Sequence, residues 1–284
     1  MIKCKIITSD IKKGDNEVGI ERGIMTDRTK NLIGVVGIGS GAGATLVASG
    51  LATVLARGEG GAAYVQEGDI GRLRGCEQFK PFDQLSLQTV FGKKKMYDLF
   101  HLHREGIDIE GRANLYNRVN WVVNVPGEYR KPVKNQGFQS EKNENLRLPY
   151  HKIGGRNIVV DTPNDISEMD KLVCVIDPLP SKIKSAIDIF THLKEVEKTG
   201  TKGHILWVIN KYNSYVNQKQ LEKFLQIKAD YILEMIEPEV FYQAEYAEIM
   251  PMSDSEWKTG FGKFRAFFDV LNEMGKTMEE ASKY

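Results

Sequence analysis

The sequence has few cysteines and no excess of charge of either sign. Its three cysteines, Cys4, Cys76 and Cys174, lie far apart among 284 residues, and none belongs to a Cys-x-x-Cys pair. Such a sparse set argues against a disulfide framework or a zinc knuckle and fits a reducing cytoplasm. Lysine and arginine total 39 and aspartate and glutamate total 38, so the net charge of +1 gives no general case for binding nucleic acid or an anionic membrane.

The amino terminus also lacks the apolar run and small-residue cleavage site of a signal peptide. One uncharged segment, residues 33–56, is long enough to cross a bilayer. Its centre carries glycine at positions 37, 39, 41 and 43, and each glycine inside a helix costs about 1 kcal/mol relative to alanine. We therefore expect a strand, a glycine loop and a buried helix here, and at most a peripheral contact with membranes.

Apolar runs alternate with helical patterns along most of the chain. Near-continuous Ile and Val runs indicate strands covered on both faces, at 32–37, 62–66, 121–125, 157–161, 172–176 and 204–209. Apolar positions at helical spacing predict helices at 46–57, 183–196, 221–235 and 264–278. Repeated strand–helix–strand units imply an α/β fold with a mainly parallel sheet flanked by helices.

Two regions depart from this alternation. Residues 1–30 are charged, and we expect them to form an amino-terminal extension with room for one edge strand at 2–8. Residues 127–156 are polar and irregular, and loops of this length in a compact domain are usually functional or disordered.

The glycine segment follows a predicted strand and opens a predicted helix. Backbone N–H groups in such a loop, together with a helix amino terminus, bind phosphate, and glycine permits the close approach of its oxygens. Counting back from Thr45, the pattern GxxxxGK[ST] keeps the threonine and Gly43. Ala44 stands at the lysine position and Ile38 at the first glycine. The spacing therefore predicts a phosphate-binding loop without its positive charge.

These residues resemble a known family. The stretch GIGSGAGATLVASGLATVLA is similar to the deviant Walker A loop of MinD/ParA-type ATPases, KGGVGKT followed by a small-residue helix. Further segments come in the family's order: Glu67-Gly68-Asp69 resembles its D-x-D switch, 158–163 its D-x-P segment, 208–211 its strand ending in an asparagine, and 249–251 its loop beside the base. The resemblance covers residues 31–280.

The resemblance implies a three-layer P-loop NTPase domain over 31–284, with ATP or ADP and Mg²⁺ as cofactors. It also implies a homodimer and a protein partner. It assigns the metal site to Thr45, Asp161 and Glu67, and the attacking water to Asp69. It assigns nucleotide binding to Gly39, Ser40, Gly41, Ala42, Gly43, Ala44, Thr45, Leu46, Asn210 and Pro251.

The loop departs from the family at both of its lysines, whose positions hold Gly39 and Ala44. Each charge-assisted contact is worth roughly 1.5–3 kcal/mol, so nucleotide binding should weaken. Hydrolysis should suffer more, because phosphoryl transfer relies on positive charge in the transition state. Candidate replacement cations are Arg72, Arg74, Lys93, Lys94, Lys95 and Lys211. We expect a pseudo-ATPase scaffold that acts through partners, similar to the CpaE/TadZ pilus-assembly group, with an active ATPase as the alternative.

Other interpretations stay open. The loop could be a tight turn without a ligand. It also meets G-x-G-x-x-A from Gly37 to Ala42, with Glu67 ending the next strand, as in NAD(P)-binding Rossmann oxidoreductases. Asp161 could cap a turn, and Asn210 could end a strand without contacting a base. Asp177 is expected to form a turn before Pro178.

Overall fold

The computed structural model describes residues 30–67, 95–123, 125, 130–133, 147–199, 205–237, 239 and 265–280. The predicted extension at 1–30 therefore lies outside the described residues except for Lys30, as does most of segment 127–156. The predicted sites at Asp69 and Pro251, and the candidate cations at 72, 74, 93 and 94, also lie outside them.

The described residues form an eight-stranded sheet in the order β3-β4-β2-β5-β1-β6-β7-β8. All neighbouring pairs are parallel except β3 with β4, which confirms the predicted mainly parallel sheet. The strands are β1 (Asn31–Ile38), β2 (Ala62–Gln66), β3 (Leu115–Tyr116), β4 (Val119–Val122), β5 (Asn157–Asp161), β6 (Lys171–Ile176), β7 (Ile205–Tyr212) and β8 (Tyr231–Glu234).

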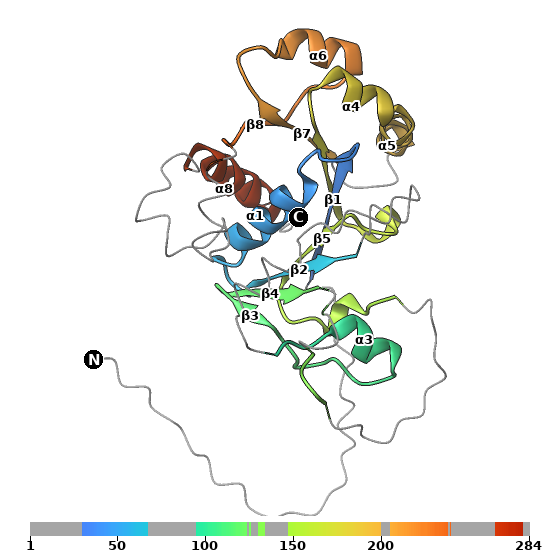
Figure 1. Ribbon diagram of the computed structural model, residues 1–284, viewed down its shortest axis with the longest axis vertical. Coiled ribbons are helices and arrows are strands. Elements are labelled where there is room, and N and C mark those ends of the chain that lie inside the picture. The colour runs from blue at the N-terminus through green and yellow to red at the C-terminus, as the bar shows by residue number, and fades with distance from the viewer. Residues whose placement is uncertain are drawn as a thin grey trace, which may run out of the picture.

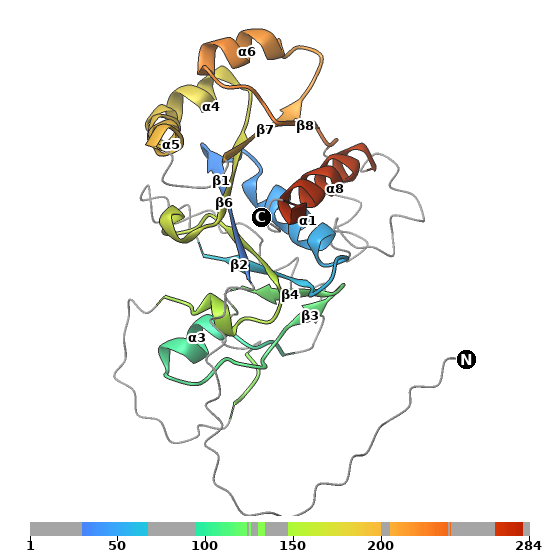
Figure 2. The same ribbon diagram turned by 180° about the vertical axis from the view of Figure 1, so that it is seen from behind.

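Helices cover both faces of this sheet. On one face α1 (Ala44–Leu55) and α8 (Arg265–Glu280) pack against the strands, and they lie side by side in Figures 1 and 2. The other face is covered by α3 (Leu99–Arg104), α4 (Pro180–Ser185), α5 (Ile187–Thr199) and α6 (Gln218–Leu225). Two short 3-10 turns, η2 (Tyr150–Lys152) and η3 (Ile166–Glu168), complete the described elements.

The strand sequences explain why both faces are buried. Successive side chains of a strand point to opposite faces, so an unbroken apolar run supplies two cores. On β1, Ile33 and Val35 join the core beneath α1 and α8, while Ile38 joins the core beneath α4 and α5. The uncharged segment 33–56 therefore folds as a strand, a loop and a helix. No helix among the described residues combines the length and the apolar character needed to span a membrane.

Several predicted elements differ from the structure in their bounds or type. The single helix predicted at 183–196 is divided into α4 and α5 at Ala186. The helix predicted at 221–235 is wrong beyond Leu225, where Gln226 adopts a left-handed conformation and the chain continues into β8. Pairing with β7 overrides the helical spacing there, because the aromatic and branched residues of β8 suit a strand. The strand predicted at 121–125 begins earlier, at Val119, and ends at Val122.

Candidate functional site

The glycine loop, residues 39–43, joins β1 to α1 at the carboxyl edge of the parallel sheet. Three of its glycines have positive φ angles: 92° at Gly39, 75° at Gly41 and 92° at Gly43. This left-handed region is open to glycine without steric cost. Gly43 is also required by space, because a Cβ atom there would lie 2.2 Å from Nδ2 of Asn210. The backbone of the loop therefore depends on the alternating glycines.

The loop leaves a row of backbone N–H groups unpaired. Gly39 donates to Gly37 O over 3.0 Å, and Ala42 donates weakly to Gly39 O over 3.4 Å. No side chain caps the start of α1. Within the described part of the chain, no acceptor bonds the amides of Ser40, Gly41, Gly43, Ala44, Thr45 and Leu46. Such a row at a helix amino terminus carries partial positive charge and suits an anion.

A buried carboxylate lies at the start of α1. Thr45 Oγ1 and the Tyr64 hydroxyl each donate to Asp161 Oδ2 over 2.8 Å, and Thr162 Oγ1 donates to Oδ1 over 3.2 Å. Asp161 is only 2% exposed, and burial raises the pKa of its carboxyl against the lowering effect of these three hydroxyls. Burial, together with the neighbouring Asp161 carboxylate, raises the pKa of Tyr64.

The structure thus brings together two of the three residues predicted as a metal site. Hydroxyl and carboxylate oxygens are ligands that Mg²⁺ accepts beside phosphate. No sequence pattern singled out Tyr64, although a hydroxyl in the otherwise mostly apolar strand AAYVQ is a signal that could have identified it. The Tyr64 hydroxyl contacts Asp161 from the neighbouring strand β2.

Two residues of β7 donate hydrogen bonds to carbonyl oxygens of the loop. Asn210, 3% exposed, donates from Nδ2 to Ala42 O over 2.8 Å. The Lys211 ammonium donates to Gly41 O and pairs with Asp177 Oδ2 at 3.0 Å. The pairing of β7 with β8 is irregular at this point, and Lys211 has a φ of 57°. The loop is therefore tied to the sheet through both of its central carbonyls.

Asp177 has two roles in this arrangement. Its Oδ1 accepts from the Leu179 amide over 3.1 Å, which confirms the predicted turn. Its other oxygen binds Lys211, one of the predicted replacement cations. Lys95 is also described, but no hydrogen bond or ion pair joins it to the loop within the described ranges.

A further cation at the loop comes from α4. A Cβ atom on Gly41 would lie 3.8 Å from the Nζ of Lys182. Lys182 follows the loop by more than a hundred residues and shares its helix with Lys184, and nothing in the sequence separates the two lysines. Only the packing of α4 distinguishes them.

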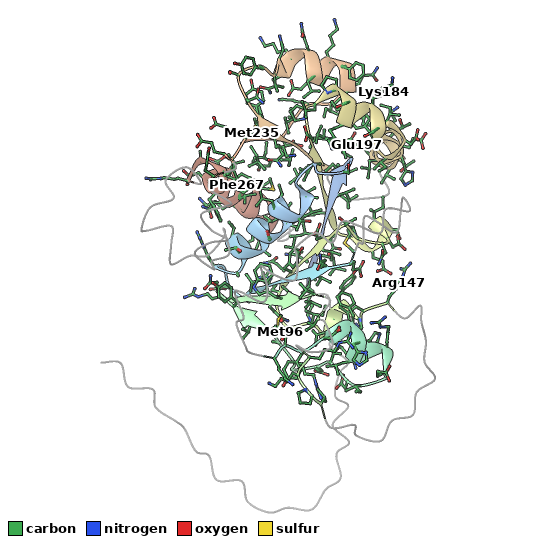
Figure 3. The ribbon with its side chains drawn as sticks, viewed as in Figure 1. Met96, Arg147, Lys184, Glu197, Met235 and Phe267 are labelled. Carbon is green, nitrogen blue, oxygen red and sulfur yellow. The ribbon has the colours of Figure 1, made fainter. Side chains whose placement is uncertain are left out.

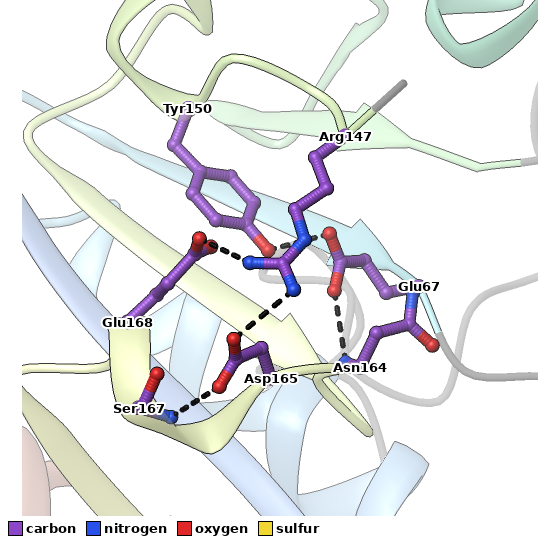
Figure 4. Close-up of polar contacts among 7 residues, drawn as sticks. All are labelled: Glu67, Arg147, Tyr150, Asn164, Asp165, Ser167 and Glu168. Atoms are coloured by element: carbon purple, nitrogen blue, oxygen red, sulfur yellow. Dashed lines mark hydrogen bonds and ion pairs between the residues drawn. The ribbon is translucent and has the colours of Figure 1, made fainter. Parts of the chain in front are cut away.

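Glu67, predicted as a metal ligand, is held in a separate cluster at the end of β2 (Figure 4). Its Oε1 accepts from the Tyr150 hydroxyl over 2.5 Å and its Oε2 accepts from the backbone N–H of Asn164 over 3.1 Å. Burial, and then the hydrogen bond to Glu67, raise the pKa of Tyr150. Beside them, Arg147 pairs with Asp165 and Glu168. No hydrogen bond among the described residues joins the Glu67 side chain to Thr45 or Asp161, so its metal role stays a prediction.

Comparison with known proteins supports the fold. No family model matches the sequence, and no curated protein matches it. Among solved structures, a ParA family ATPase from Chlorobium tepidum TLS aligns over 87% of this chain and 98% of its own, at 14% identity and a TM-score of 0.59.

Two further structures align in the same way. A plasmid partition protein from Borrelia burgdorferi B31 bound to AMPPNP aligns over 86% of this chain and 97% of its own, at 14% identity and a TM-score of 0.53. A chain of the MinC:MinD cell division protein complex from Aquifex aeolicus aligns over 88% and 96%, at 13% identity and a TM-score of 0.56. The predicted MinD/ParA-type P-loop NTPase fold is therefore confirmed.

Proposed function

We propose that this chain binds ATP or ADP with Mg²⁺ at the glycine loop and the start of α1, residues 39–46, and acts in the cytoplasm as a scaffold with weak or no ATPase activity. The observation that carries the proposal is the row of N–H groups between Ser40 and Leu46 that, apart from that of Ala42, have no acceptor among the described residues, beside the Thr45–Asp161 pair. A turn with no ligand has no need for this arrangement. The neighbour bound to AMPPNP, an ATP analogue, supports a nucleotide as the anion.

The metal fits the oxygen atoms present. Thr45 Oγ1 and Asp161 Oδ2 lie 2.8 Å apart at the start of α1, where the phosphates would meet the loop amides. Bound there, Mg²⁺ would offset the negative charge of the phosphates. Thr45 and Asp161 would hold the ion directly or through water, and Tyr64 would keep the Asp161 carboxylate in place.

Weak hydrolysis follows from the loop itself. Gly39 and Ala44 supply no ammonium group, and losing two charge-assisted contacts weakens binding by about 10²–10⁴-fold. Asp69 as the residue that orients water stays a prediction, because it lies outside the described residues. Asn210 holds Ala42 through its Nδ2, and its predicted contact with a base stays a prediction beside that role.

We extend the proposal to assembly: the chain forms a homodimer and acts through a protein partner. One neighbour was solved as a complex of MinD with MinC. In such a scaffold, nucleotide binding would shift the chain toward one conformation, and hydrolysis of the nucleotide would not be required. Sizing chromatography with and without Mg–ATP tests the dimer, and a single unchanged monomer peak would contradict it.

Titration calorimetry with Mg–ATP, Mg–ADP and NADH tests the nucleotide. We expect ATP and ADP to bind and NADH not to bind. Binding of NADH alone would favour the dinucleotide interpretation, and no binding of any of the three would leave a tight turn without a ligand. A phosphate-release assay comparing the parent with Asp161→Ala separates scaffold from enzyme. Equal rates support the scaffold, whereas a rate that falls in the variant supports an active ATPase.

A further inference from the structure

Helix α4 packs directly against the loop at Gly39, the position where the loops of MinD/ParA-type ATPases carry a lysine. A Cβ atom on Gly39 would lie 3.2 Å from the carbonyl oxygen of Lys182 and 3.3 Å from Cβ of Ala186. A larger residue at 39 would have to push the helix away, and the φ of 92° also disfavours it. Gly39 stands where the family has a lysine, and its lack of a side chain lets α4 pack against the loop. Helix α4 itself carries a lysine, Lys182.

The Lys182 ammonium reaches the exposed part of the loop. Its Nζ lies 3.8 Å from the position of a Cβ on Gly41, whose amide is among the unpaired N–H groups. Lys182 is half-buried, and its ammonium makes no hydrogen bond or ion pair within the part of the chain that the structure describes. A positive group therefore lies beside the loop, and no carboxylate among the described residues forms an ion pair with it.

Lys211, the other ammonium at Gly41, is in a different state. It donates to Gly41 O and pairs at 3.0 Å with Asp177, a carboxylate that is only 2% exposed. Most of its charge is thus offset within the protein, and its contact with a loop carbonyl fixes the backbone. Of these two lysines, Lys182 is the one available to an anion.

We propose that Lys182 binds the phosphate chain of the nucleotide and so replaces, from α4, the ammonium groups that the loop lacks. The proposal rests on the proposed function, because it assigns a residue to the same site. The attraction between an ammonium and a phosphate chain increases with the charge of the chain. Lys182 therefore selects ligands by phosphate number: it strengthens the binding of ATP and of inorganic tripolyphosphate more than that of AMP.

Calorimetry on the full chain tests this with Lys182→Gln, Lys182→Arg and a matched control, Lys184→Gln. Lys184 lies on the same helix and is exposed (Figure 3), so its removal changes the net charge of the protein equally. We expect Lys182→Gln to weaken Mg–ATP and tripolyphosphate by about tenfold or more, and AMP by less. Lys182→Arg should stay within about threefold of the parent, and Lys184→Gln should match the parent.

The outcomes separate the two proposals. Parent-like binding of ATP by Lys182→Gln would overturn the role of Lys182 and leave the proposed function standing. Equal weakening by Lys182→Gln and Lys184→Gln would also overturn it, since only overall charge would then matter. Failure of the parent to bind ATP, ADP or tripolyphosphate would overturn both. If Lys182→Gln lowers the melting temperature, Lys182→Met takes its place, because methionine keeps the aliphatic stem and removes the ammonium. Weakened binding of Mg–ATP by Lys182→Met supports the role of Lys182, and parent-like binding overturns it.

Discussion

The two ends of the glycine loop have different surroundings, with a carboxylate and hydroxyl groups at one end and ammonium groups at the other. At the helix end, Thr45 meets a buried carboxylate, Asp161, whose oxygens are hydrogen bonded to three hydroxyl groups. At the apex, Gly41 is exposed and lies beside two ammonium groups, those of Lys211 and Lys182. The helix end therefore gathers buried oxygen atoms, and the apex is exposed beside positive charge.

The difference shows that a glycine loop with no lysine of its own can still lie beside positive charge. The helix end depends on residues of α1, β2 and β5, namely Thr45, Tyr64 and Asp161. The apex obtains positive charge from β7 and α4, which come much later in the chain.

Gly43→Ala should disturb both ends at once. Alanine at a φ of 92° is strained, and its Cβ would also meet Asn210 Nδ2. We expect the free energy of unfolding to fall by roughly 2–6 kcal/mol in urea titrations. Gly61→Ala is the control, because Gly61 has a φ of 67° and no atom within 4 Å of the added Cβ. It should cost roughly 1–3 kcal/mol, and equal losses would show that the contact with Asn210 is unimportant.

Ala44→Lys should give the helix end of the loop an ammonium group, which at present only the apex has beside it. If the loop amides converge on phosphate, Mg–ATP should bind roughly 10–100-fold more tightly by calorimetry. Ala266→Lys adds the same charge at an exposed position on α8 and should leave the affinity unchanged. No gain from Ala44→Lys would count against a phosphate cradle.

Asp161→Asn should change how stability depends on pH. Burial raises the pKa of Asp161 in the folded chain, so the folded state holds a proton that the unfolded state releases first. Its contribution is therefore most favourable below the unfolded pKa and is lost as pH rises through the folded pKa. Urea titrations across acidic pH should show this decline in the parent and not in the variant.

Asp165→Asn provides the opposite comparison. Hydrogen bonds to Ser167 lower the pKa of Asp165, so its stabilising contribution is present above the unfolded pKa and disappears as pH falls through the folded pKa. The two substitutions should therefore remove slopes of opposite sign. Slopes of the same sign would show that the hydrogen bonds from the three hydroxyls outweigh burial and lower the pKa of Asp161.

Tyr64→Phe should give the smallest effect, because it removes one of three hydroxyl donors to Asp161 and leaves the apex intact. We expect a loss of about 1 kcal/mol in the free energy of unfolding. Tyr150→Phe removes a hydroxyl donor to Glu67 at a more exposed place and should cost less. Mg–ATP affinity should change little in both variants, and a large loss in Tyr64→Phe would make that hydroxyl part of the metal site.

Much of the fold could be predicted from the sequence, since the strands at 62–66 and 157–161 match to the residue. The helix predicted at 221–235 was wrong, because neighbouring strands, not local spacing, determine β8. Within the site, the resemblance pointed to Thr45 and Asp161 together. Lys182 was not predicted, because only the packing of α4 brings it to the loop. Tyr64 was missed although its hydroxyl stands in a mostly apolar strand, because its contact with Asp161 joins strands distant in the chain.

The space left by the missing Cβ of Gly43 is occupied by the amide nitrogen of Asn210. Positions 43 and 210 are therefore coupled across 166 intervening residues, and a bulkier side chain at position 43 requires a shorter one at position 210. In natural variants of this chain the two should change together, and a double substitution with alanine at 43 and glycine at 210 should cost less than the sum of its single changes.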